Sequence, residues 1–229
     1  MTSLLPALVG LALGVRHAFE PDHLAAVSTL ATEQKSARAG LLLGAWWGLG
    51  HTAALLLVGG SLALLEAEMP AHAALAFEAL VGVMVVGLGL RALKRAVDEG
   101  RRGAVTPHEH AGLAHTHPTT GDHLHVRGWT LATRPLLIGL MHGLAGSGAL
   151  TALVLAELPS AAARLSYIAL FGLGSVAGMA LLTGLAGVPL MRVARAPRAA
   201  AALLGVAGAL SVAVGAFWAF ASARELAGL

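Results

Sequence analysis

Residues 16–23 have the sequence Arg16-His17-Ala18-Phe19-Glu20-Pro21-Asp22-His23, and they interrupt an otherwise apolar run from Leu4 to Ala31. A membrane-spanning helix needs roughly 20 apolar residues, so the run is long enough to cross a bilayer. A charged side chain near the bilayer centre costs on the order of 2.5–3.5 kcal/mol on insertion scales. Ionisable side chains clustered at this point are hard to explain as packing, and they predict a metal or proton site buried in a membrane.

The composition is that of a polytopic membrane protein. Of the 229 residues, 57% are hydrophobic and 12% are charged, whereas a soluble domain carries about 25% charged residues. The chain has no cysteine, which excludes disulfides and thiolate metal sites. The basic residues flank apolar segments instead of forming a patch, so they indicate orientation in a lipid bilayer and no nucleic-acid partner.

Six apolar segments predict an all-α fold with six transmembrane helices. The segments are Leu4–Ala31, Ala39–Leu65, Ala73–Leu93, Pro135–Leu158, Ala161–Met191 and Ala199–Ala221. Twelve of the 15 lysines and arginines lie in or beside the first, third and fifth connections. The positive-inside rule then places these connections in the cytoplasm and both termini outside, in the inner (cytoplasmic) membrane.

The two halves of the chain resemble each other. The sequence Gly14-Val15-Arg16-His17 matches Gly139-Leu140-Met141-His142, and Gly48-Leu49-Gly50-His51 matches Gly172-Leu173-Gly174-Ser175. Three segments in each half force the halves into opposite orientations, as in the inverted repeats of many transporters, whose substrate sites lie near the midplane. We therefore expect a three-helix repeat at residues 1–98, a disordered cytoplasmic histidine-rich loop at 99–133, and a second three-helix repeat at 134–229.

Pro21 is expected to bring His17, Asp22 and His23 around one ion. These three positions point in different directions in a regular helix. However, proline has no N–H to donate to the carbonyl of His17, so the helix should kink or unwind. Imidazole nitrogens with a carboxylate oxygen suit nickel, cobalt, copper or zinc. A structural polar kink and a proton relay without metal are the alternatives.

Two further histidines lie in glycine-rich parts of predicted helices. His51 follows Gly48-Leu49-Gly50, and His142 lies between Gly139 and Gly143. A lone histidine in a membrane helix often forms only a helix–helix hydrogen bond, whereas flanking glycines favour close approach to a shared site. Together with His17 and His23, they would supply four imidazoles from three segments, as metal ligands or as groups that orient the ligands.

The third connection contains three His-x-His pairs beside Asp122. They are His108 and His110, His115 and His117, and His123 and His125. A flexible histidine-rich segment of this kind is typical of metal capture with moderate affinity. An expression tag is the alternative, but the interrupted spacing inside the chain argues against it.

These motifs resemble those of the nickel/cobalt permease superfamily. The stretch RHAFEPDHLAAV resembles the signature H-x-x-x-x-D-H, here His17, Asp22 and His23, and GLGHTAAL with His51 resembles a second block. The stretch GLMHGLAGSGAL with His142 resembles a block of the shorter branch, which includes urease-accessory-type membrane proteins. The larger permeases have more helices and an Asp-Thr motif in a later segment, where this chain has His142 and Ser147. The resemblance implies a secondary transporter of Ni²⁺ or Co²⁺ with the signature residues essential for the substrate.

The leading hypothesis is thus a secondary transporter of divalent transition metal, with no enzymatic activity and no resident cofactor. The expected partners are the transported ion and the bilayer, and a cytoplasmic metallochaperone is a candidate partner. A membrane accessory or sensor protein that binds metal without moving it is one alternative. A metal-dependent membrane enzyme with Glu20 as its base is another. The inverted repeat favours transport, and the sequence fits import and export equally.

Overall fold

The fold is a bundle of long helices with one interrupted element and one small hairpin. The computed structural model describes residues 4–31, 36–102, 123–126, 129–193 and 196–228. Its helices, in chain order, are α1 (Leu4–His17), α2 (Pro21–Ala31), α3 (Ala37–Ala54), the π-helix η1 (Leu55–Gly59), α4 (Gly60–Leu65), α5 (Ala71–Arg102), α6 (Thr133–Glu157), α7 (Ala161–Val193) and α8 (Pro197–Gly228). Two strands, β1 (His123–Val126) and β2 (Trp129–Ala132), pair antiparallel.

Five helical stretches among the described residues are long and apolar enough to cross a bilayer: the continuous α3–η1–α4 unit, α5, α6, α7 and α8. The first predicted segment differs, because it consists of the 14-residue α1 and the 11-residue α2. At 1.5 Å per residue these helices are about 21 Å and about 16 Å long, so neither crosses a hydrocarbon core of roughly 30 Å alone. The helical fold predicted from the sequence is confirmed, and five of the six predicted segments are single helical stretches of sufficient length.

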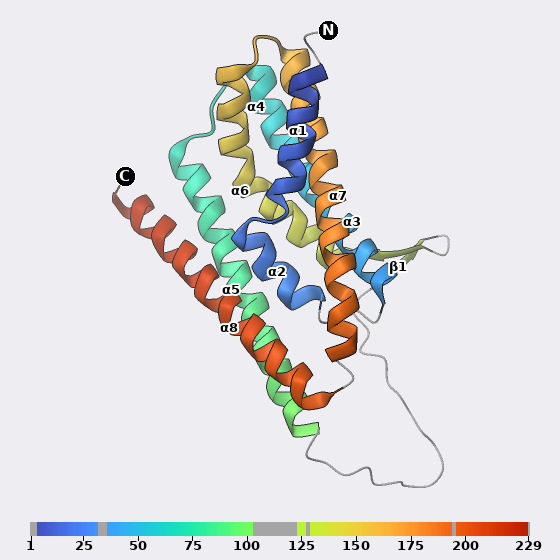
Figure 1. Ribbon diagram of the computed structural model, residues 1–229. Helices are drawn as coiled ribbons and strands as arrows, with labels where there is room; N and C mark the ends of the chain where they lie inside the picture. Colours follow the sequence, from blue (N-terminus) through green and yellow to red (C-terminus); the bar gives the residue numbers. More distant parts are fainter. Residues whose placement is uncertain (1–3, 32–35, 103–122, 127–128, 194–195, 229) are drawn as a thin grey trace.

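The interruption is a tight turn in front of Pro21. The N–H of Phe19 donates to the carbonyl of Arg16 at 2.9 Å, and the N–H of Glu20 donates to that of His17 at 3.0 Å. Proline is well tolerated as the first residue of a helix, where its missing N–H would have no intrahelical acceptor. The break predicted at Pro21 is therefore confirmed, and Figure 1 shows α1 and α2 placed end to end with a change of direction between them.

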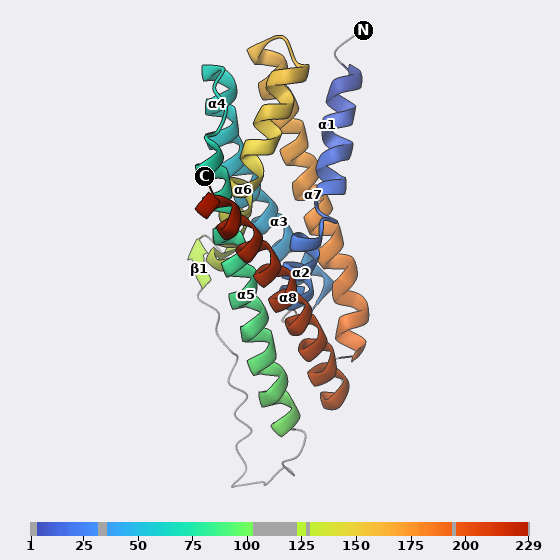
Figure 2. The same cartoon turned by 90° about the vertical axis from the view of Figure 1, so that its left-hand side faces the viewer.

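The long helices are arranged in two groups. The first contains α1, α3, α6 and α7, which run side by side, and the second is the antiparallel pair α5 and α8 (Figures 1 and 2). The pair approaches closely through glycine. A Cβ on Gly82 would lie 2.8 Å from the carbonyl oxygen of Gly215, and a Cβ on Gly89 would lie 2.7 Å from that of Gly208. Small residues of this kind let membrane helices pack backbone to backbone.

Two apolar clusters make up most of the core of the first group. One joins α2, α3, α6 and α7, and its buried members are Ala18, Ala26, Val27, Leu43, Trp47, Ile138 and Met179. The other joins the η1–α4 end of the α3 unit to α6 and α7, and its buried members are Leu55, Ala63, Leu150, Val154, Tyr167 and Ile168. On α3 and on α6, the stretch between the two clusters carries His51 and His142.

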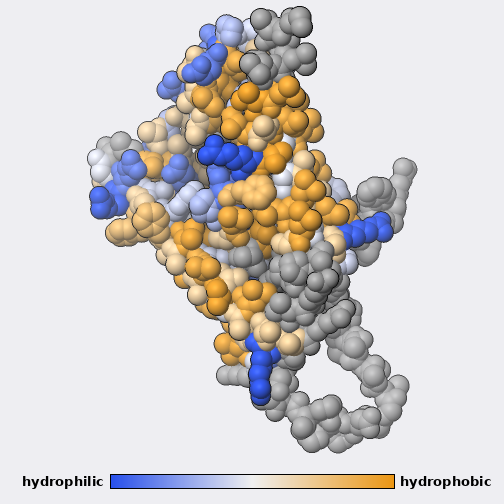
Figure 3. All heavy atoms as spheres, viewed as in Figure 1, coloured by the Kyte–Doolittle hydropathy of each residue, from blue (hydrophilic) through white to orange (hydrophobic). Residues whose placement is uncertain are grey.

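The outer surface carries many exposed apolar side chains. Figure 3 shows hydrophobic side chains over most of one face, with a hydrophilic patch near its middle. Arg16 and Glu20 are exposed, and they lie at the α1–α2 break at about this height in the same view. The polar turn thus opens toward the surface at a depth where the surrounding side chains suit lipid.

The β1–β2 hairpin is a small exception within an otherwise helical fold, whose predicted all-α character is confirmed. Residues 123–126, inside the segment 99–133 that was predicted to be disordered, pair with 129–132 in the register Val126 opposite Trp129. Valine, threonine and tryptophan favour strands, and the segment supplies all three. The helix α5 also continues to Arg102, beyond the predicted end at Leu93. Its last turns are polar, so hydropathy did not mark them as part of the helix.

Candidate metal site

The turn between α1 and α2 presents His17, the last residue of α1. Its Nδ1 lies 2.9 Å from Oε2 of Glu20. Its Nε2 is buried and has no hydrogen-bond partner among the described residues. A carboxylate on one ring nitrogen fixes the tautomer and leaves the other nitrogen free to bind a metal.

Asp22 and His23 occupy the first turn of α2, directly after the proline that starts it. Both are buried, with 7% and 1% of their surfaces exposed. His23 Nδ1 lies 3.0 Å from Asp22 Oδ1, and His23 Nε2 has no partner. The pair therefore offers one oriented imidazole and one carboxylate inside the bundle.

His51 on α3 and His142 on α6 complete the set. His51 is fully buried, and neither of its ring nitrogens has a partner in the part of the chain that the structure describes. His142 donates from Nδ1 to the carbonyl of Ile138 at 3.2 Å, which leaves Nε2 free. Glycine allows the two helices to meet here, because a Cβ on Gly143 would lie 2.4 Å from the carbonyl oxygen of His51.

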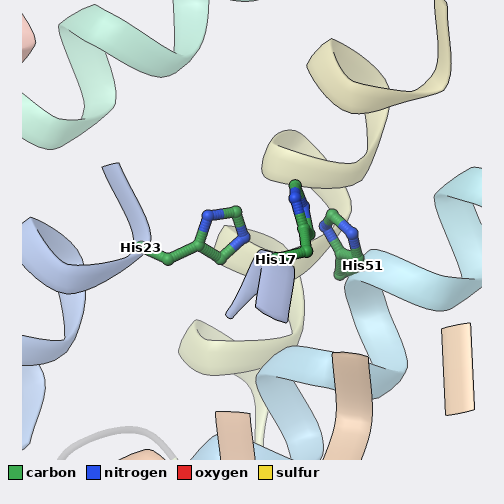
Figure 4. A group of neighbouring side chains, drawn as sticks. All are labelled: His17, His23 and His51. Atoms are coloured by element: carbon green, nitrogen blue, oxygen red, sulfur yellow. The ribbon is translucent and has the colours of Figure 1, made fainter. Parts of the chain in front are cut away.

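The four imidazoles converge from four elements. The ring centroids of His17 and His23 are 4.5 Å apart, those of His17 and His51 5.0 Å, and those of His23 and His142 4.8 Å. Figure 4 shows His17, His23 and His51 with their rings gathered from α1, α2 and α3. Asp22 Oδ2 lies 3.6 Å from Nε2 of His142. The structure therefore brings together all five residues for which the sequence predicts a buried metal site.

The unpaired nitrogens of the cluster are typical of a metal site and unusual in a packed core. Six buried side-chain nitrogens lack a partner among the described residues, and five of them belong to these four histidines. An unsatisfied buried polar group costs about 1–3 kcal/mol, so the cluster is expensive unless a ligand occupies it. Four neutral imidazoles with one carboxylate match late divalent metals, whereas imidazole is a poor ligand for Ca²⁺ or Mg²⁺.

Aromatic rings enclose the cluster, a feature that the sequence interpretation missed. Trp47 is fully buried, stacks on His23 at 5.5 Å with an interplanar angle of 15°, and meets His142 edge-on at 5.5 Å. Phe171 lies 5.3 Å from His17. The available signal was the position of Trp47 one helical turn before His51, which puts both on the same face of the helix. A lone tryptophan, however, is more often a core residue than part of the wall of a binding site.

The metal-capture role of the histidines in the third connection stays a prediction. His108, His110, His115 and His117 lie outside the described residues, as does Asp122. His123 and His125 lie on β1, opposite Ala132 and Thr130 of β2.

The chain is similar to a known protein family and to a curated protein. Residues 5–220 match the family described as high-affinity nickel-transport proteins. The urease accessory protein UreH of Bacillus sp. (strain TB-90) is 33% identical over 207 residues, which cover 90% of this chain and 87% of that protein. No solved structure matches the chain.

Proposed function

Because this chain belongs to the family of high-affinity nickel-transport proteins, we propose that it is a secondary transporter that carries Ni²⁺ or Co²⁺ across the cytoplasmic membrane. Membership of a transport family makes the protein a multi-pass membrane transporter and excludes the alternative of a metal-dependent enzyme. The metal is substrate here, and the proposal needs no resident cofactor.

The observation that carries the proposal is the convergence of His17, Asp22, His23, His51 and His142 at the centre of the bundle. Their free ring nitrogens and one carboxylate supply ligands of the type that nickel and cobalt prefer. The site combines both halves of the chain, since His142 comes from α6 and the other four residues come from α1, α2 and α3. A site shared by two halves is what alternating access requires, because relative movement of the halves can change the side to which it opens.

The inverted-repeat arrangement, also part of the proposal, is supported by matching glycine contacts. A Cβ on Gly14 would lie 2.0 Å from the carbonyl oxygen of Phe171, and a Cβ on Gly139 would lie 1.9 Å from that of Trp47. Gly139 follows Gly14 by 125 residues, and Phe171 follows Trp47 by 124. The α1–α7 contact and the α6–α3 contact are thus made by equivalent positions of the two halves.

Two more contacts follow the same rule. Gly174 approaches the carbonyl oxygen of Leu11, and Gly50 approaches that of Leu136, each with a Cβ-to-oxygen distance of 2.1 Å. In the α5–α8 pair, a shift of 126 residues converts the Gly82–Gly215 contact into the Gly89–Gly208 contact. A twofold relation between α1–α5 and α6–α8 accounts for all of these pairs at once.

The orientation is proposed from the ends of the helices. The chain leaves α2, α5 and α7 at the same end of the bundle (Figure 1). The helix turns next to this end carry basic residues: Arg38, Arg91, Lys94, Arg95 and Arg198. The positive-inside rule then puts this end and the histidine-rich loop in the cytoplasm, and both termini outside.

A radiometal flux experiment tests the proposal. Sealed vesicles containing the purified protein should accumulate ⁶³Ni²⁺ or ⁵⁷Co²⁺ without ATP, and Asp22→Asn vesicles should not. Uptake in intact cells with and without the protein then gives the direction. Metal binding without any flux would overturn the transport proposal.

That outcome would favour the second candidate, a membrane accessory protein that binds metal without moving it. The printed name of the relative, a urease accessory protein, is the observation that favours this candidate. Flux in vesicles distinguishes the two functions, because both bind the ion and only one moves it.

A further inference from the structure

The five candidate ligands fall into two overlapping groups. His17, His23 and His51 can each offer one ligand atom within 4.8 Å of the others, and so can Asp22, His23 and His142. Within this distance, the described residues form these two groups and not one group of five. The only member of both is His23, which is 1% exposed.

We propose that the cluster holds two adjacent ion positions, occupied in turn, with His23 as the shared ligand. Position A consists of His17, His23 and His51, and position B consists of Asp22, His23 and His142. This inference rests on the proposed function and specifies how the ion passes from one half of the chain to the other.

The two positions differ in charge. Position A offers three imidazoles, whereas position B offers two imidazoles and the carboxylate of Asp22. Passage between them exchanges His17 and His51 for Asp22 and His142 while His23 stays bound. The ion therefore never loses all its ligands inside a medium in which a bare charge is very costly.

The two positions also adjoin different walls. Phe171 contacts His17, which belongs to position A alone, whereas Trp47 contacts His142, which belongs to position B alone, as well as the shared His23. Phe171 lies ten residues after the start of α7, and Trp47 lies ten residues after the start of α3. These helices run in opposite directions (Figure 1), so the two rings lie toward opposite ends of the bundle. Position A is thereby associated with one membrane side and position B with the other.

Double-mutant cycles of Co²⁺ binding to the purified full chain in detergent test the proposal. The single variants are His51→Ala, which damages only position A, and His142→Ala, which damages only position B. Each is then combined with His17→Ala or with Asp22→Asn. The asparagine keeps an oxygen that accepts from His23 Nδ1. His72→Ala is the matched control, because His72 is an exposed histidine at the start of α5.

Two positions predict a crossed pattern. Adding His17→Ala to His51→Ala should change the Co²⁺ affinity less than about threefold, whereas adding it to His142→Ala should lower the affinity at least about 100-fold. Asp22→Asn should behave in the opposite way. The two single variants should also give different Co²⁺ d–d spectra, from an all-imidazole site and from a site with a carboxylate, and both should fail to transport the ion.

A single five-ligand site gives another result. Each substitution would then lower the affinity in either background, and the two single variants would share a carboxylate-containing spectrum. That outcome overturns the two-position inference and leaves the proposed transport function intact. Absence of Co²⁺ binding by the unmodified chain and by His72→Ala would instead overturn the metal site itself, and with it both proposals.

Discussion

Oδ2 of Asp22 lies 3.6 Å from Nε2 of His142, although 120 residues separate the two in sequence. Asp22 belongs to the first half of the chain and His142 to the second, and both are buried. Their approach ties the two halves together at a polar point inside a largely apolar bundle. A carboxylate beside an imidazole on another helix is well placed to share an ion.

Replacing Asp22 by asparagine or alanine should abolish metal transport. Asparagine is nearly isosteric, so it removes the negative charge while the helix packing stays in place. We expect residual flux below about 1% of the unmodified chain, which corresponds to about 3 kcal/mol, the lower end of the cost of removing one partner of a buried ion pair. The measurement is radiometal uptake normalised to the amount of protein in the membrane, with His72→Ala as the control. Flux by Asp22→Asn at the unmodified rate would show that the carboxylate is not part of the path.

Trp47→Ala should destabilise the protein and impair transport, because a fully buried indole against His23 and His142 is lost. Truncation of a buried tryptophan costs about 3–5 kcal/mol. Trp47→Phe should recover most of the stability, since a smaller ring still packs on His23. The neighbouring Trp46 is only partly buried, and Trp46→Ala is the matched control. Thermal unfolding in detergent checks the prediction, and equal losses for Trp46→Ala and Trp47→Ala would contradict it.

Gly139→Ala should displace α6 from α3, because the added Cβ would lie 1.9 Å from the carbonyl oxygen of Trp47. The backbone cannot yield cheaply at such a contact, and we expect a loss above about 3 kcal/mol, in the range that marks severe overpacking. Gly87→Ala provides the control, since a Cβ there meets nothing within 4 Å. The control should be neutral or stabilising by up to about 1 kcal/mol, the difference in helix propensity. Equal unfolding temperatures for the two variants would refute the prediction.

Replacing the six histidines of the third connection by glutamine should leave transport measurable and raise the metal concentration needed for half-maximal rate. These substitutions leave His17, Asp22, His23, His51 and His142 unchanged, so the path through the membrane should stay intact. The histidines would act by raising the local metal concentration. Flux as a function of metal concentration is the measurement, and complete loss of flux would place these residues in the path itself.

Acidification should weaken metal binding by the purified protein. A ring nitrogen must be deprotonated to bind a metal, so protons and metal compete for the four imidazoles. Lowering the pH from about 7.5 to about 5.5 should therefore raise the dissociation constant at least tenfold, with protons released as metal binds. Calorimetry in two buffers of different ionisation enthalpy measures that release. An affinity independent of pH would contradict imidazole ligation.

Several features followed from local sequence because their causes are local. Pro21 cannot donate a backbone hydrogen bond, so the break in front of it was predictable. The apolar segments likewise predicted the long helices, although α5 and α8 extend beyond the predicted ends at Leu93 and Ala221. Hydropathy marks where a helix leaves the lipid, and a polar helix can continue past that point.

Other features depend on packing that one sequence does not fix. The sequence allowed two interpretations of His51 and His142, a shared metal site or separate helix–helix hydrogen bonds. It did not decide between them, because the distance between the two side chains depends on how α3 and α6 cross. That crossing is set by glycine contacts such as Gly50 with Leu136. The role of Trp47 as a wall was missed for the same reason. The β1–β2 hairpin was missed because its strands are only four residues each.

The interruption between α1 and α2 also has an electrostatic consequence. A helix carries roughly half a negative charge at its C-terminal end and half a positive charge at its N-terminal end. Here α1 ends at His17 and α2 begins at Pro21, so the negative end of one macrodipole faces the cluster while the positive end of the other supports the ionised form of Asp22. The helix α6 runs unbroken past His142 and supplies no such ends. Among the helices that carry the five residues, the pair of helix ends at the cluster thus belongs to the first half of the chain, and their field would move with that half when the protein changes conformation.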